Sequence, residues 1–268
     1  MELKATRDAY GHALLELGAD DPRIVVLDAD LSRSTRTEWF QQKFPDRFFN
    51  LGIAEQNMVG VASGLALTGL IPFATTYAIF VGRAYDQIRE AVCYADTNVK
   101  VVATHAGLAA SYDGGAHQGI EDLALMRVIP RMTVLSPADY NEARQAVRAA
   151  AGFPGPVYIR LQKEPVPVIT PPDRPFVIGR VTTLAEGDDV ALVATGSLTA
   201  RALAAAGALR EEGVAAAVVN VSTLKPLDAA AVRRAVARAG CAVTVEEHNR
   251  YGGLHEAVLA ALAGEVHA

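Results

Sequence analysis

The residues best suited to chemistry in this sequence are polar side chains that follow short apolar runs. Five such segments occur in the first 160 residues: Asp28–Ser34, Asn50–Met58, Thr75–Phe80, Thr104–Gly119 and Tyr158–Arg160. Apolar runs of this length are typical of buried strands, and open α/β sheets bind ligands at the carboxyl ends of their strands. We therefore expect these segments to meet at one edge of a sheet and to form a site there.

Several of these residues also have ordinary structural roles to weigh. Glu55 opens a predicted helix, where a carboxylate stabilises the macrodipole. Tyr77 and Phe80 have the spacing of core residues on one helix face. Asp113 and His117 favour a function more strongly, because their loop DGGAHQG has a poor composition for building a core.

The other candidates have competing roles as well. Asp30 and Ser34 are common loop formers. His105 ends an apolar strand, as a hydrogen-bonded core histidine would. Arg160 closes a strand and fits a solvated strand end. Taken singly, these positions leave both interpretations open.

Motifs of other enzyme classes are missing. The sequence contains no Walker A or GxGxxG loop, no HExxH and no GxSxG. Its two cysteines, Cys93 and Cys241, lie far apart and outside any CxxC pair, which argues against a disulfide framework or a Cys-rich metal site. We predict no metal ligands in this chain, and a cytoplasmic location is the default.

Composition sets broader limits. The 268 residues are 51% hydrophobic and 21% charged, which excludes intrinsic disorder. The net charge of −5 argues against nucleic acid and anionic membrane as partners, because phosphate binding needs a basic face. No charge-free run of about 18 apolar residues occurs, so no membrane span is predicted.

The alternation of apolar runs with helix-period segments predicts parallel-sheet α/β architecture. The expected strands before the Pro-rich stretch EPVPVITPPDRPF are Arg23–Ala29, Leu70–Thr75, Val99–His105, Thr133–Leu135 and Val157–Leu161. The expected helices there are Thr6–Leu17, Ala54–Leu67, Ala78–Ala95, Ile120–Arg127 and Ala138–Ala151. After that stretch, strands at Val190–Thr195, Ala216–Asn220 and Ala242–Glu246 alternate with helices at Thr199–Glu212, Asp228–Ala239 and Leu254–Ala263. We predict a domain at 1–165, an extended linker at 166–177 and a smaller domain at 178–268.

In this order, the polar segments resemble the C-terminal half of transketolase, a thiamine-diphosphate enzyme. The matching text is DADLSRS, LGIAEQNMVGVASGLAL, TTYAIF, THAG followed by DGGAHQGIED, and YIR. The resemblance covers nearly the whole chain and implies a pyrimidine-binding domain followed by a smaller, shortened C-terminal domain. It also implies an activity, the transfer of a two-carbon ketol unit between sugar phosphates.

The resemblance assigns the cofactor end of the site. Thiamine chemistry needs a carbanion on the thiazolium ring, and the family forms it with the help of the cofactor's own aminopyrimidine. A carboxyl group in a dry pocket donates a hydrogen bond to that pyrimidine, and Glu55 matches the position. Phe80 would stack on the pyrimidine ring. The other implied cofactor contacts are Tyr77, Arg83, Leu31 and Asp30.

The substrate end is assigned in the same way. His105 and Asp113 would face the substrate, and His117 would transfer a proton or donate a hydrogen bond near the reacting carbons. Together with Glu55 these form the implied catalytic set. The residues implied to meet the sugar phosphate are Arg7, Ser34, His105 and Arg160, since arginine forks suit phosphate oxygens.

The family's diphosphate- and Mg²⁺-binding half, with its GDG…N motif, is absent from this sequence. The resemblance therefore implies the second subunit of a split transketolase, whose N-terminal partner subunit would bind the diphosphate and ligate Mg²⁺. An α2β2 assembly would follow.

Some features favour other functions. Arg83 with AYDQ, and AGL after His105, look more like deoxyxylulose-phosphate synthase, and DGGAHQ differs from the family's DGPTHQ. The alternatives are a synthase-like enzyme, the beta subunit of a 2-oxo acid dehydrogenase, or a non-catalytic partner of a thiamine enzyme. The joint presence of Glu55, Phe80, Asp113 and His117 argues against the last.

Overall fold

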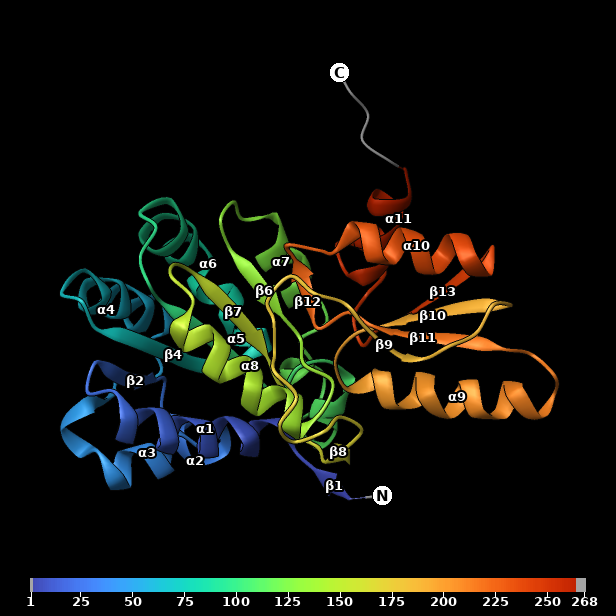
Figure 1. The fold of residues 1–268 in the computed structure, drawn as a ribbon. Helices are drawn as coiled ribbons and strands as arrows, with labels where there is room; N and C mark the ends of the chain where they lie inside the picture. Colours follow the sequence, from blue (N-terminus) through green and yellow to red (C-terminus); the bar gives the residue numbers. More distant parts are fainter. Residues whose placement is uncertain (1, 264–268) are drawn as a thin grey trace.

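The larger of two main sheets carries the predicted polar segments. The computed structural model describes residues 2–263. Seven strands form this sheet in the order β12-β6-β7-β5-β4-β2-β3 (Figure 1). Their bounds are β2 Ile24–Asp28, β3 Phe48–Asn50, β4 Ile71–Tyr77, β5 Lys100–Thr104, β6 Thr133–Leu135, β7 Val157–Arg160 and β12 Thr223–Lys225. All neighbours are parallel except β12, which runs antiparallel to β6.

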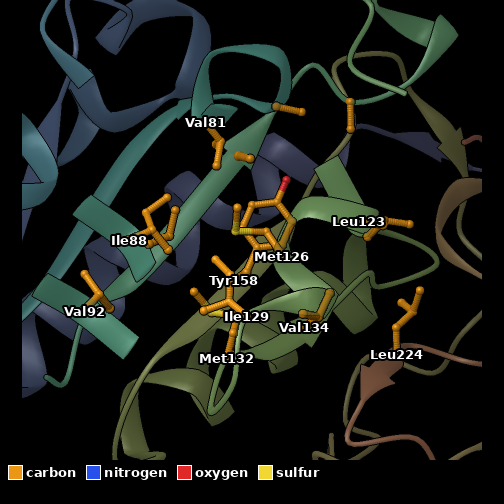
Figure 2. Packing of buried hydrophobic residues seen from close by; sticks show 14 of the residues in the cluster. Val81, Ile88, Val92, Leu123, Met126, Ile129, Met132, Val134, Tyr158 and Leu224 are labelled. Carbon is orange, nitrogen blue, oxygen red and sulfur yellow. The ribbon is translucent and has the colours of Figure 1, made fainter. Parts of the chain in front are cut away.

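Helices cover both faces of this sheet, which explains the continuous apolar runs of its strands. One apolar cluster joins Tyr10, Phe40 and Val147 to one face. Their helices are α1 Thr6–Asp20, α3 Thr37–Lys43 and α8 Tyr140–Gly152. The opposite face packs against α4 Glu55–Leu67, α7 Asp122–Val128 and the segment from Ala78 to Tyr94. Figure 2 shows this second cluster, which includes Ile88 and Met126.

The second sheet has the strand order β13-β10-β11-β9. Its strands are β9 Thr182–Ala185, β10 Val190–Ala194, β11 Ala216–Asn220 and β13 Ala242–Val245. The helices packed on it are α9 Thr199–Glu211, α10 Ala229–Ala239 and α11 Leu254–Ala263. The predicted α/β class is confirmed, and the antiparallel β9 and β12 add to the expected parallel strands.

The region after the Pro-rich stretch is tied closely to the first sheet. Strand β12 belongs to that sheet, and Leu224 joins its core cluster (Figure 2). The predicted extended linker also contacts the rest of the chain, because β8 Val166–Pro167 pairs with β1 Leu3–Lys4. The buried Asp139 carboxylate accepts hydrogen bonds from the backbone of Ile169 and Thr170.

The helix expected over Ala78–Ala95 is interrupted. It consists of α5 Ala78–Val81, a 3₁₀ turn at Gly82–Ala84, α6 Tyr85–Gln87 and a π-helical segment at Ile88–Tyr94. Glycine lowers helix propensity, and tight or wide helical turns often occur beside functional sites. The break contains Arg83, one of the predicted site residues.

No helix among residues 2–263 combines the length and the apolar character that crossing a bilayer requires.

Candidate functional site

The carboxyl ends of β4 and β5 bring three rings into one stack. Tyr77 ends β4, and its ring lies between those of His105 and Phe80. The ring centroids are 3.8 Å apart for Tyr77–His105 and 5.6 Å apart for Tyr77–Phe80, with interplanar angles of 22° and 11°. The His117 ring is tilted by 64° and 70° from those of Tyr77 and Phe80, with ring centroids 6.1 and 5.4 Å away. The predicted aromatic and histidine residues therefore converge.

His105 is held tightly at one end of the stack. Its side chain is 1% exposed, and its φ of +57° lies in the left-handed region, an uncommon conformation that is concentrated at functional sites. Nδ1 lies 2.8 Å from Thr104 Oγ1, and Nε2 lies 3.4 Å from Arg7 Nη1. Arginine can only donate, so Nε2 accepts and the ring proton lies on Nδ1.

Burial is the main cause that lowers the pKa of His105 to about 3, and the charges of Arg7 and Lys163 contribute to the same shift. The imidazole is therefore neutral at physiological pH. The His105 ring therefore contributes a hydrogen-bonding nitrogen to the site. The positive charge near it comes from Arg7 and Lys163.

Arg7 supplies that charge from the first turn of α1. Its Nη1 donates to the Ser34 carbonyl at 2.9 Å, which places the predicted Ser34 beside it. Its Nε is buried and has no hydrogen-bond partner. Buried donors are rarely left unpaired, so this guanidinium N–H is suited to an anionic ligand.

A glycine-rich loop forms the next part of the site. The Asp113 carboxylate accepts hydrogen bonds from Lys163 Nζ at 2.9 and 3.1 Å. The hydrogen bond from Lys163 lowers the pKa of Asp113, so the carboxyl stays ionised. His117 follows in the same loop, and its Nδ1 is buried without a partner.

Glu55 lies at the other end of the aromatic row, at the start of α4. Its side chain is 4% exposed, and Oε1 lies 3.5 Å from Arg83 Nη1. The Arg83 guanidinium also lies 4.8 Å from the Phe80 ring centre. Glu55 and Arg83 line an open hollow of 520 Å³ together with residues 53, 54, 56 and 57. The structure thus joins Arg7 to Glu55 through His105, Tyr77, Phe80 and Arg83.

Two predicted cofactor residues lie outside this row. Asp30 is exposed, has a φ of +64° and accepts a hydrogen bond from Asn50 Nδ2. Leu31 directly precedes the short helix α2 Ser32–Thr35, and its backbone N–H donates to the buried Asp28 carboxylate. Neither contacts the aromatic row through a hydrogen bond or ring contact.

Arg160 has other partners than those predicted. Its side chain is 4% exposed, and Nε donates to Asp122 Oδ2 at 2.8 Å. Its Nη2 donates to the carbonyls of Gly119 and Glu247. This burial does not fit a solvated strand end. Nε and Nη2 donate to protein groups here, and the phosphate contact stays a prediction.

This buried pair leads to a stability prediction. We expect Arg160→Met to lower the free energy of unfolding by about 3–5 kcal/mol, because it leaves the Asp122 carboxylate buried and unpaired. Arg144→Met, which removes a partly exposed pair with Glu16, should cost at most about 1 kcal/mol. Urea unfolding of both variants measures the difference, and equal losses would contradict a special role for the buried pair.

Sequence reasoning missed Lys163, Gln162 and Glu247. Lys163 reaches Asp113 from beyond the end of β7, and Gln162 Nε2 donates to Glu247 Oε2 at 2.8 Å. The only available signal for Lys163 was a basic residue close after a strand end, and Arg160 carried the same signal more strongly. Nothing in the sequence pattern pointed to Glu247.

The arrangement fits one half of a thiamine-type cofactor. The buried Glu55 carboxyl, the Phe80 ring and the adjoining hollow suit a flat heteroaromatic ring with nitrogen atoms at its edge. Within residues 2–263, no cluster of three or more His, Cys, Asp or Glu side chains could hold a metal ion.

Comparison with known proteins agrees with this geometry. Residues 2–168 match the family described as "Transketolase, pyrimidine binding domain", and residues 179–268 match "Transketolase, C-terminal domain". A protein described as a transketolase C-terminal section from Methanocaldococcus jannaschii is 44% identical over 263 residues, covering 97% of this chain and 82% of that protein. A 6-deoxy-6-sulfo-D-fructose transketolase subunit from Clostridium sp. strain MSTE9 is 43% identical, with 94% and 78% covered.

A solved structure shows the same fold over nearly the whole chain. It is titled "Split gene transketolase, inactive beta4 tetramer", is 53% identical and superposes with a TM-score of 0.90. The match covers 98% of this chain and 86% of that one.

Proposed function

Because the chain belongs to the transketolase family, we propose that it is the pyrimidine-binding subunit of a split, thiamine-diphosphate-dependent transketolase. It would transfer a two-carbon ketol unit between sugar phosphates in a complex with a partner subunit. The observation that carries this proposal is the continuous row from Arg7 to Glu55. It has a positively charged end at Arg7, an aromatic middle and a buried carboxyl at the far end.

The Glu55 end would hold the cofactor's pyrimidine. When bound, thiamine diphosphate supplies an acidic thiazolium carbon and an electron sink for the carbon–carbon bond that breaks. Glu55 would hold a proton in a hydrogen bond between its carboxyl and the pyrimidine nitrogen, with Phe80 against the ring face. Arg83, which pairs with Glu55 here, would have to yield part of that contact.

The Arg7 end would orient the substrate. Arg7 has an unpaired buried donor, and Lys163 lies close enough to affect both His105 and Asp113. The cations Arg7 and Lys163, with the neutral His105 imidazole beside them, would suit a phosphate group. They would equally suit the sulfo group in the name of the Clostridium relative. Holding the remote anion would leave the ketol carbons beside His117 and the aromatic row.

A substrate comparison tests this part of the proposal. We expect Arg7→Met to lower kcat/KM for ribose 5-phosphate by about tenfold to a hundredfold, because one charge-assisted hydrogen bond contributes roughly 1.5–3 kcal/mol. Activity with free ribose should change by less than about threefold, since that acceptor has no remote anion. The assay uses the subunit reconstituted with its partner and a ketose phosphate donor.

Arg33→Met is the matched control, because Arg33 is an exposed arginine next to Ser34. It should leave both acceptors unaffected. An equal proportional loss on the two acceptors in Arg7→Met would show that Arg7 does not recognise the phosphate. Turnover of pyruvate with none of a ketose phosphate would favour the synthase-like or dehydrogenase-like alternative instead.

A further inference from the structure

Glu247 joins the C-terminal region of the chain to the loop that carries Asp113 and His117. It follows β13, and its Oε1 accepts a short hydrogen bond from the backbone N–H of Ala109. Its Oε2 accepts from Gln162 Nε2 at 2.8 Å and lies 3.4 Å from Ser197 Oγ. One carboxylate therefore contacts both chain segments that flank the substrate end of the site.

The contact lies at the base of the loop. Gly107 N donates to the Gly119 carbonyl at 2.7 Å, which closes the loop between residues 107 and 119. A Cβ on Gly107 would lie 2.5 Å from the Glu247 carboxyl carbon, so the carboxylate lies directly against this backbone. Gly107 also has a φ of +71°, which glycine adopts without strain.

The same carboxylate is linked to the cation that pairs with Asp113. Gln162 donates to Glu247, and the next residue, Lys163, donates to Asp113. The Glu247 carbonyl accepts from Arg160, whose Nε is fixed by Asp122. Through these contacts Glu247 fixes the distance between the base of the loop, at Ala109, and the segment Gln162–Lys163.

Both carboxylate oxygens of Glu247 accept from N–H donors, so a glutamine cannot keep both contacts unless one of its partners rearranges. With its oxygen toward Ala109 N–H, the amide would turn its NH₂ group toward Gln162, whose own amide would have to turn over to accept through Oε1. The substitution keeps the shape of the side chain and removes the charge-assisted hydrogen bonds.

We propose that Glu247 is a positioning residue, through which the C-terminal region sets the placement of Asp113 and His117 for catalysis. The effect on catalysis rests on the proposed transketolase function. The effect on the loop does not, because it concerns contacts within this chain alone.

The neighbouring Glu246 provides a matched control. Its two oxygens accept from the backbone N–H groups of Leu254 and His255 at 2.6 and 2.8 Å, at the start of α11. Glu246→Gln therefore breaks the same kind of contact one residue away, without touching the loop at residues 107–119. Melting temperatures of both variants report the general cost to stability.

Hydrogen–deuterium exchange of the purified chain tests the loop. In Glu247→Gln, amides in residues 107–119 should exchange at least about tenfold faster than in the wild type, as expected for loss of a charge-assisted hydrogen bond. In Glu246→Gln the increase should be confined to residues near 252–258. Unchanged exchange at 107–119 in Glu247→Gln would overturn the proposal. If Glu247→Gln does not fold, Glu247→Asp, which cannot span both donors, replaces it.

Activity of the reconstituted complex tests the consequence. Glu247→Gln should lower kcat at least about tenfold while the cofactor dissociation constant changes by less than about threefold, because Glu55 and Phe80 keep their contacts. Glu246→Gln should retain kcat. Faster loop exchange with an unchanged kcat would overturn the positioning role. An inactive wild-type complex would instead refute the proposed function, and the exchange experiment would still decide whether Glu247 holds the loop.

Discussion

Glu55→Ala should abolish ketol transfer in the reconstituted complex while leaving the fold and the partner contact intact. The Glu55 side chain is 4% exposed and lines the hollow beside Phe80, so its carboxyl is the group available to a pyrimidine nitrogen there. Loss of a positioned proton donor typically costs about 10²–10⁴-fold in rate. Glu55→Gln should be less harmful, because an amide can still donate a hydrogen bond.

The direct measurement is exchange of the cofactor's C2 proton, followed by NMR in the complex. It should be slowed strongly in Glu55→Ala and less in Glu55→Gln. Gln56→Ala is the control, because Gln56 lines the same hollow and is exposed. If Glu55→Ala exchanges the proton as fast as the wild type, Glu55 serves only the start of α4 and the proposed mechanism is wrong.

Much of the site could be predicted because it depends on strand order and short motifs. Thr75–Phe80 includes the end of β4 and Thr104–Gly119 begins at the end of β5, and these two strands are parallel neighbours in the sheet. Their carboxyl ends share an edge, so the convergence of Tyr77, Phe80 and His105 follows from the βαβ pattern. The α/β class was predictable for the same reason.

The contacts of charged side chains could not be predicted in this way. Arg160 and Asp122 are 38 positions apart, and Gln162 and Glu247 are 85 apart. Whether an arginine at a strand end points to solvent, to a ligand or to a buried carboxylate depends on how distant elements pack. The pattern therefore located the sheet edge, but it did not reveal the Arg160–Asp122 pair or the contact of Lys163 with Asp113.

Local helix geometry shows a similar limit. The apolar spacing of Ala78–Ala95 indicates one helix, yet the segment changes from α to 3₁₀ and then to π geometry. Those changes place Arg83 between Phe80 and Glu55. Periodicity reports which face is buried, and it does not report a turn that tightens or widens to place one side chain.

Without a partner subunit, this chain should bind thiamine diphosphate weakly and catalyse no ketol transfer. In the proposal Glu55 and Phe80 would hold the pyrimidine, residues 2–263 gather no cluster of three or more His, Cys, Asp or Glu side chains for a metal ion, and the partner would neutralise the diphosphate. If the partner donates three charge-assisted hydrogen bonds to the diphosphate, at about 1.5 kcal/mol each, their loss weakens binding by roughly a thousandfold or more. Isothermal titration with cofactor and Mg²⁺, with and without the partner, measures this difference.

A pair of surface variants locates the partner on this chain. Ile53 and Leu67 are both 76% exposed, but Ile53 lines the hollow beside Glu55 and Leu67 ends α4 at its far end. A partner that completes the cofactor site must cover the hollow. Ile53→Lys should therefore weaken assembly at least about tenfold, because it replaces a buried apolar contact in the interface with a charge. Leu67→Lys should assemble like the wild type, as measured by analytical ultracentrifugation of the mixed subunits. Equal effects of the two lysine substitutions would place the partner elsewhere on the chain. In the titration experiment, tight cofactor binding or ketol transfer by the chain alone would contradict the split-subunit proposal.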